Sequence, residues 1–317
     1  MIIVTAANLV AIELDAAKRQ ALLDRAREVV LVDWFGTKVA AHFNQPGEAD
    51  AFRWRYRSFL SSGRPDFVSC AVASDDEEPC FFTEPGEAFR YPLVLRGTGV
   101  VAFLADAVTG RGFFGIHPSL LSFHAAAVSV GNSAAAISAI STGGKSTTAF
   151  ACARRGMGLY TDERCVLKDG FVYPFPRAMN VRAGGIDLLL SEQVPDDEVM
   201  ARPLRGHAGK DWECIQFCEV FGARPLPKPA KLESIFFITG KSRTPRAEPL
   251  ERPGALQRLL ESSFSGAAPG MDRLAAAAEL LQQARAYALT LGTPDDTALL
   301  IAATVRREKP MFAVAGP

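Results

Sequence analysis

A short glycine-rich run holds the residues most suited to chemistry. It reads Ser141-Thr142-Gly143-Gly144-Lys145-Ser146-Thr147, and with Ala139 before it the run matches G-x-x-x-x-G-K-[ST] except at the first glycine. In such a loop, successive backbone N–H groups face a phosphate chain, the following helix adds the positive end of its dipole, and the lysine supplies a full charge. The serine hydroxyl can bind a magnesium ion that bridges two phosphates. We therefore expect residues 141–147 to bind a nucleotide, with Lys145 on its phosphates and Ser146 on Mg²⁺.

Alanine at position 139 is the departure from this motif. A backbone with positive φ would cost alanine about 1 kcal/mol or more, whereas an extended backbone accepts its methyl group. Ala139 ends an apolar run typical of a strand, so we expect the extended backbone.

Two adjacent acids and a histidine are candidates for the chemistry around the loop. Asp162 and Glu163 follow a short strand pattern at Gly158 to Thr161, where one carboxylate could hold magnesium and the other could accept a proton. The alternative is a solvated acidic turn. His124 lies in the apolar run before the loop and is either a site residue or a histidine packed in the core.

The surrounding patterns predict the elements that position these residues. Apolar runs at Phe123 to Val130 and Ser133 to Ile140 are joined by Gly131-Asn132, a pair suited to a hairpin turn. The second run leads into the glycine-rich loop, and a helix from Ser146 to Arg155 is expected to end at Gly156. Farther along, the predictions are strands at Leu159–Leu167, Phe171–Phe175, Leu232–Thr239 and Ala288–Leu291, a helix at Met271–Tyr287, and a last helix capped by Thr293.

The N-terminal part mixes helix and strand patterns. Asp15 is the expected N-cap of a helix, a strand pattern covers Val29 to Phe35, and Ser74 to Gly86 has the composition of a loop. Glu48 to Leu60 fits helix and strand periodicity equally, and its length favours a helix. Because single cores stop growing above about 250 residues, we expect 317 residues to form two domains, an α+β domain at 1–95 and a nucleotide-binding domain at 96–317.

Composition and charge limit the classes of binding partner that we expect for this protein. The 35 basic and 35 acidic side chains cancel, which argues against nucleic acid or an anionic membrane as a partner. The six cysteines are scattered and do not suggest a disulfide framework. No basic residue precedes the apolar start, so a secretion signal is not expected, and no run approaches the roughly 20 apolar residues of a membrane span. We expect a cytoplasmic protein.

Three runs together resemble a known family. FHAAAVSV, AISAISTGGKSTTAFACARRG and MGLYTDERCVL are similar to the catalytic domain of bacterial HPr kinase/phosphorylase and to the shorter HPr-kinase-like enzymes found beside genes for modified peptides such as lasso peptides. The resemblance covers residues 121–167 well and continues loosely to about residue 305. It implies an α/β fold with the mixed sheet of a phosphoenolpyruvate-carboxykinase-like P-loop core, and the Gly131-Asn132 turn favours that sheet over an all-parallel one.

The resemblance also implies an activity and roles for residues. The activity is transfer of the γ-phosphoryl group of ATP, with Mg²⁺, to a serine hydroxyl of a peptide or protein, which includes a ribosomally made precursor peptide. Lys145 would bind the β-phosphate, Ser146 the metal, and Asp162 would act as the base with His124 beside it. Glu163 stands where the family usually has a second aspartate. The kinase/phosphorylase relatives form hexamers, so the resemblance also allows a homo-oligomer.

A basic residue should approach the γ-phosphate. By family-like location the candidates are Lys210, Arg182, Arg243 and Arg246, with the first two preferred. The family's phosphorylase signature begins with an acid, and the nearest run here, Asn180-Val181-Arg182-Ala183-Gly184, lacks it, which implies a kinase without efficient phosphorylase activity. The cluster Arg53, Arg55 and Arg57 is either a solvated face or a site for an acidic peptide.

Three functions remain open at this level. The first is a serine kinase acting on a peptide or protein. The second is a kinase of a small hydroxylated metabolite. The third is a nucleotide-binding switch or degenerate kinase that does not transfer phosphate, which the departures at Ala139 and Glu163 suggest.

Overall fold

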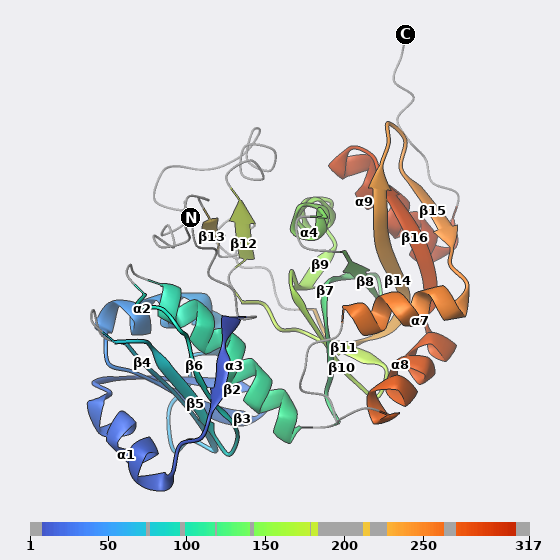
Figure 1. The fold of residues 1–317 in the computed structure, drawn as a ribbon. Coiled ribbons are helices and arrows are strands. Elements are labelled where there is room, and N and C mark those ends of the chain that lie inside the picture. The colour runs from blue at the N-terminus through green and yellow to red at the C-terminus, as the bar shows by residue number, and fades with distance from the viewer. Residues whose placement is uncertain are drawn as a thin grey trace, which may run out of the picture. The chain divides into compact units, whose positions relative to one another are not determined.

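The computed structural model describes nine stretches of the chain. These are residues 8–73, 77–95, 99–117, 119–139, 143–177, 179–182, 212–215, 227–262 and 271–308. The described residues divide into two compact units, the first holding 8–117, 180–182 and 212–215 and the second holding 119–179 and 227–308. We expected a boundary after residue 95, and the contacts instead place the division at His117. Each unit is mixed α/β (Figure 1).

The first unit contains a six-stranded mixed sheet in the order β1-β6-β5-β4-β3-β2. Its elements are β1 (Val10–Ile12), α1 (Ala16–Arg25), β2 (Glu28–Trp34), β3 (Thr37–Phe43), α2 (Pro46–Arg55), the 3₁₀ turn η2 (Arg57–Phe59), β4 (Phe67–Val72), β5 (Cys80–Glu84), β6 (Ala88–Arg90) and α3 (Val100–Ile116). Strands β3 and β4 are parallel, and the other neighbours are antiparallel. Helix α3 packs against β4 and β5, and Phe113 meets Trp34 edge-on at 5.2 Å between ring centroids. Aromatic side chains thus supply much of this core.

Local predictions for this unit are mostly confirmed. The Asp15 side chain accepts a hydrogen bond of 2.8 Å from the backbone N–H of Lys18, as an N-cap should. Between the helix and the strand that Glu48 to Leu60 could form, the structure has a helix, α2, at Pro46–Arg55. The loop prediction for 74–86 is wrong in part, because β5 lies within it. Phe81 and Phe82 are fully buried, so the acids and prolines around them concealed a short apolar strand.

The arginine cluster does not form one surface. Arg55 is buried and its Nε donates a 3.1 Å hydrogen bond to Asp106 on α3. The side chains of Arg53 and Arg57 are more exposed. The three arginines therefore do not share the solvated face that alternation suggested.

The second unit is built on a mixed sheet with the path β11-β10-β7-β8-β14-β16-β15, with β9 also paired to β7. Its elements are β7 (Leu121–Val130), β8 (Ser133–Ser138), α4 (Lys145–Arg154), β9 (Gly158–Thr161), β10 (Arg164–Lys168), β11 (Phe171–Tyr173), β14 (Ala230–Lys241), β15 (Arg246–Pro249), α7 (Arg252–Glu261), α8 (Met271–Gln283), β16 (Arg285–Leu291) and α9 (Pro294–Arg306). Strand β14 runs parallel to β8 and β16, while β7 and β8 form the predicted antiparallel hairpin. A mixed sheet is therefore confirmed.

Two pairs of helices cover this sheet. Residues of α7 and α8 belong to one buried cluster with Phe123, Ala125 and Ala127 of β7. Helices α4 and α9 contact each other, and both contact β7 and β8. Because side chains alternate along a strand, His124 lies on the opposite face of β7 from Phe123. That is the face on which α4 packs.

Two element boundaries in this unit differ from the predictions. The expected strand at 159–167 is split into β9 and β10 by a bend at Asp162 and Glu163. The expected helix at 271–287 ends at Gln283, and β16 begins at Arg285. Alanine favours a helix, but Arg285 to Tyr287 pair with β14 and therefore belong to the strand.

A third, two-stranded sheet pairs β12 (Met179–Arg182) with β13 (Trp212–Ile215). Across the described parts of the chain, none of the helices has the length and apolarity required to cross a lipid bilayer.

Candidate active site

Strand β7 brings the predicted site residues together. On one side, Ala125 pairs with Ser138 at the end of β8, directly before the glycine-rich loop. On the other side, His124 pairs with Arg164, the first residue after the bend that carries the acids. Neighbouring strands lie about 4.8 Å apart, so the loop and the acidic bend flank the same short segment of β7.

The described part of the loop ends in a glycine with a left-handed backbone. Gly144 has φ +100° and is the N-cap of α4. A Cβ atom at this position would lie 2.9 Å from Cδ1 of Leu291, so both the backbone and the space favour glycine. Ala139 is not among the described non-glycine residues with positive φ, so its methyl group causes no backbone strain there. Ile140, Ser141 and Thr142 lie outside the described residues.

The ammonium group of Lys145 is buried at the start of α4. The side chain is 7% exposed, and Nζ donates a 3.1 Å hydrogen bond to the backbone carbonyl of Ala139. Burial lowers the pKa of Lys145, while the carboxylates of Glu163 and Asp162 act in the opposite direction and raise it. The two acids thus partly offset the effect of burial on this ammonium.

The bend between β9 and β10 is held by a threonine. The Oγ1 atom of Thr161 accepts hydrogen bonds from the backbone N–H groups of Glu163 at 3.3 Å and of Arg164 at 3.1 Å. Asp162 is 2% exposed, and it lies directly between these bonded groups in sequence. The solvated acidic turn that we considered is thus excluded for Asp162.

Two buried arginines join the site, and the sequence analysis missed both. Arg164 opens β10 opposite His124, and Arg177 forms an ion pair with Glu163. The side chain of Arg177 is buried, whereas that of Glu163 is half-buried. The available signal was an arginine placed next to short apolar runs, in ERCVL and in PFPRA, where a charge needs a partner.

Burial and these charges together determine the protonation state of His124. Burial is the main cause that lowers the pKa of His124 to about 4, and the cations of Lys145, Arg177 and Arg164 lower it further while Glu163 opposes them. The imidazole is therefore neutral at pH 7. A neutral imidazole can donate one hydrogen bond and accept another, but it adds no positive charge to the site.

The other residues that the sequence analysis predicted for the site lie in different surroundings. Ser146 and Thr147 lie half-buried in the first turn of α4. Lys210 lies outside the described residues, and the side chain of Arg182 in β12 is not described. Arg243 and Arg246 are exposed in and after the turn between β14 and β15. In the parts of the chain that the structure describes, no three His, Cys, Asp or Glu side chains cluster as a ready metal site.

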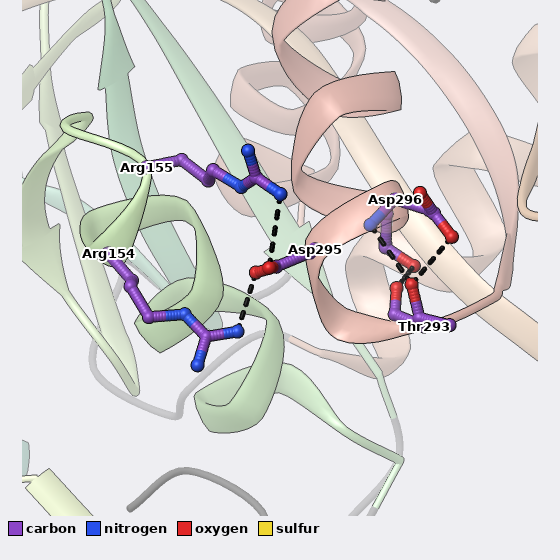
Figure 2. A network of polar contacts seen from close by, with 6 residues as sticks. Arg154, Arg155, Thr293, Asp295 and Asp296 are labelled. Carbon is purple, nitrogen blue, oxygen red and sulfur yellow. Dashed lines mark hydrogen bonds and ion pairs between the residues drawn. The ribbon is translucent and has the colours of Figure 1, made fainter. Parts of the chain in front are cut away.

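The far end of α4 is fixed by a charged clamp, which Figure 2 shows. Asp295 accepts hydrogen bonds from Arg154 at 2.6 Å and from Arg155 at 3.1 Å. Asp295 stands in the first turn of α9, whose N-cap Thr293 accepts a hydrogen bond from the backbone N–H of Asp296 at 3.2 Å. The clamp holds α4 against α9 and thereby helps to fix the helix whose first residue is Lys145.

Comparisons with known proteins give weak structural similarity. No model of a protein family matches the chain, and no curated protein matches it. The solved structure of the HPr(Ser) kinase/phosphatase from Coxiella burnetii is similar with a TM-score of 0.30 and 12% sequence identity, over 59% of this chain and 88% of that chain. A TM-score of this size does not establish a shared fold, so the residues of the site carry the functional proposal.

Proposed function

We propose that this protein is an ATP-dependent kinase that transfers the γ-phosphoryl group to a serine hydroxyl of a peptide or protein, a ribosomally made precursor peptide being the first candidate. We further propose that the second unit is a P-loop core of the phosphoenolpyruvate-carboxykinase-like kind. The observation that carries the proposal is the buried Lys145 ammonium at the start of α4, a helix that packs on β7, the strand whose neighbours β9 and β10 flank Asp162 and Glu163.

The start of α4 is suited to a polyphosphate. Lys145 offers a full positive charge, and the first backbone N–H groups of α4 add donors in the direction of the helix dipole. Gly144 adds no Cβ atom at this point, where the side chain of Leu291 already lies beside the backbone. A nucleotide would therefore meet several fixed donors within one turn of helix.

The oxygen ligands at the site fit a magnesium ion. Ser146 supplies a hydroxyl in the first turn of α4, and Asp162 supplies a carboxylate, both of which are hard donors. Bound magnesium would neutralise charge on the transferring phosphoryl group.

Transfer requires an acceptor hydroxyl to lose its proton. In the proposed reaction, the acceptor oxygen forms a bond to the γ-phosphorus, the bond from that phosphorus to the β–γ bridging oxygen breaks, and ADP leaves. The acceptor proton passes to the carboxylate of Asp162, with His124 close by as a neutral hydrogen-bonding group. The buried cations of Lys145 and Arg164 would stabilise the charge that develops on the phosphate oxygens.

The test is phosphate transfer from labelled ATP. Purified protein with ATP, Mg²⁺ and serine-containing peptides should yield phosphopeptide, and the Lys145→Ala and Asp162→Asn variants should not. Arg306→Gln, which alters an exposed ion pair with Glu308, is the matched control and should retain activity. Equal activity of Lys145→Ala and the parent would contradict the proposal.

The same assay separates the other two functions. Labelling of a metabolite pool without any peptide product would indicate a small-molecule kinase. Normal nucleotide affinity without transfer to any acceptor would indicate a nucleotide-binding switch.

A further inference from the structure

We infer that Arg177 is a positioning residue of the site and that Glu163 is its partner and not a metal ligand. Together the two side chains fix the bend that presents Asp162. The catalytic consequence of this inference rests on the proposed kinase function, whereas the structural pairing does not.

The chain brings Arg177 to the bend by a defined route. After β11, the backbone N–H of Phe175 donates to the carbonyl of Tyr160 at 2.8 Å, which ties this segment to β9. The backbone N–H of Arg177 then donates to the carbonyl of Phe175 at 3.0 Å. Phe175 is fully buried, so the segment is anchored two residues before the arginine. Arg177 therefore reaches Glu163 from a fixed backbone.

The pair and Thr161 hold the bend at different points. Thr161 binds the backbone N–H groups of Glu163 and Arg164, while Arg177 binds the side chain of Glu163. Arg177 is 5% exposed, so its guanidinium is largely removed from water and depends on the carboxylate for charge compensation. Asp162 is the residue between Thr161 and Glu163. Its placement thus depends on both anchors.

The pairing argues against Glu163 as a ligand for magnesium. A carboxylate engaged by a guanidinium shares its oxygen lone pairs and its charge with that cation. A metal ion at the same oxygens would also have to approach the positive charge of Arg177. We therefore assign the metal to Ser146 and Asp162 and not to Glu163.

Electrostatics around His124 support the same arrangement. His124 pairs in register with Arg164, the residue next to Glu163, and Arg177 binds Glu163. The two charges shift the pKa of His124 in opposite directions, Glu163 upward and Arg177 downward. The pair therefore lies at the site and does not belong to a remote surface.

The experiment is a double-mutant cycle of Glu163→Gln and Arg177→Gln, with Arg177→Lys as a milder variant and Arg306→Gln as the control. We expect each single Gln variant to lower kcat by about 100-fold with little change in KM for ATP, because misplacement of a catalytic group by about 1 Å has an effect of this size. The double variant should be no worse than either single variant. Arg177→Lys should recover part of the loss, since it keeps the charge and loses the planar fork.

A second readout is the Mg²⁺ concentration that half-saturates nucleotide binding, measured by calorimetry with ADP. We expect this midpoint to be unchanged in all variants. A rise of tenfold or more in Glu163→Gln, with no rise in Arg177→Gln, would identify Glu163 as a metal ligand and overturn the inference. An unchanged kcat in Arg177→Gln would also overturn it.

A third readout does not need activity. Each single variant should lower the melting temperature, and the double variant should recover part of that loss, because removal of both buried charges leaves neither one uncompensated. If the parent transfers no phosphate, the proposed function fails, and the melting cycle and the Mg²⁺ midpoint still decide the inference. Additive losses in the melting cycle would contradict the pairing.

Discussion

Helices α3 and α4 begin in the same way and differ in what meets their first turn. Both have a left-handed glycine as N-cap, Gly99 with φ 89° and Gly144 with φ 100°, and neither N-cap has a side-chain hydrogen bond. At α3, the buried carboxylate of Glu48 accepts hydrogen bonds from Gly99 at 2.9 Å and from Ala102 at 2.8 Å. The protein thus supplies its own anion to α3.

At α4 the neighbouring charge has the opposite sign. The buried group beside the first turn is the ammonium of Lys145, which adds positive charge to an already positive helix end. The carboxylates of Asp162 and Glu163 act on this ammonium, but none of the bonds described at the first turn of α4 gives its backbone N–H groups a carboxylate acceptor like Glu48. The difference teaches that α3 is completed by an internal anion, and it supports our proposal that α4 binds a phosphate group.

Removal of Lys145 should give the largest effect. We expect Lys145→Ala to weaken ATP binding by about 100-fold or more, which is the size of effect seen when a fixed donor to a negatively charged group is removed. The melting temperature should not fall, because burial of the ammonium is itself unfavourable. Calorimetric titration measures the affinity, and Lys168→Ala, an exposed lysine of β10, is the control. Unchanged affinity would remove the distinction between the two helices.

A fall in pH should lower the free energy of unfolding through the protonation of His124. The pKa of about 4 in the folded protein lies below the ordinary value of 6.5, so the unfolded chain binds the proton first. Stability is therefore full above pH 6.5 and falls as the pH drops toward 4. Between pH 7 and pH 5 we expect a loss of about 2 kcal/mol from this residue.

Urea unfolding of the parent and of His124→Gln at the two pH values measures that contribution. The variant should retain the slope that comes from His42 and His117, whose pKa values burial also lowers. An identical pH dependence in the parent and the variant would show that the imidazole is not held neutral by its surroundings.

Removal of the internal anion at α3 should affect stability alone. We expect Glu48→Ala to lower the free energy of unfolding by about 1–2 kcal/mol, because buried N–H groups of α3 lose their acceptor. ATP affinity should remain at the parent value. Urea unfolding and calorimetry test the two parts, and a marked loss of affinity would contradict the separation of roles.

The clamp at the far end of α4 should give the smallest effect. The side chains of Asp295 and Arg155 are more than a third exposed. We therefore expect Asp295→Asn to lower the free energy of unfolding by at most about 1 kcal/mol, and by less at high salt. The two arginines lower the pKa of Asp295 against the effect of burial. The contribution is therefore present above the ordinary pKa and lost as the pH falls through the folded value. Thermal melts at low and high salt measure it.

Local signals in the sequence predicted the core of the site. The hairpin at Gly131-Asn132, the strand before the loop and the helix after it all follow from turn chemistry and periodicity, and the structure contains each of them. The segments that carry Lys145, Asp162 and His124 are neighbours because β7 pairs with strands on both sides. That pairing agrees with the order of the predicted elements.

Long-range partnerships could not be predicted in this way. Arg177 lies fourteen positions after Glu163, and their ion pair depends on the return of the chain along β9, which no local pattern announces. The pair Arg55 and Asp106 links α2 to α3 across 51 positions, and this contact removed Arg55 from the expected surface cluster. The strand β5 was missed because its apolar core is short and its flanks are rich in turn residues.

The pairing register of β7 has one further consequence. A displacement of this strand by a single position would turn His124 into the apolar layer formed with α7 and α8, and would turn Phe123 toward the charged groups. Both exchanges are strongly unfavourable, since a buried polar ring would lose its partners and a phenyl ring would meet ions. The apolar face that β7 presents to α7 and α8 therefore fixes the strand register, and this register in turn sets the positions of the polar side chains on the opposite face.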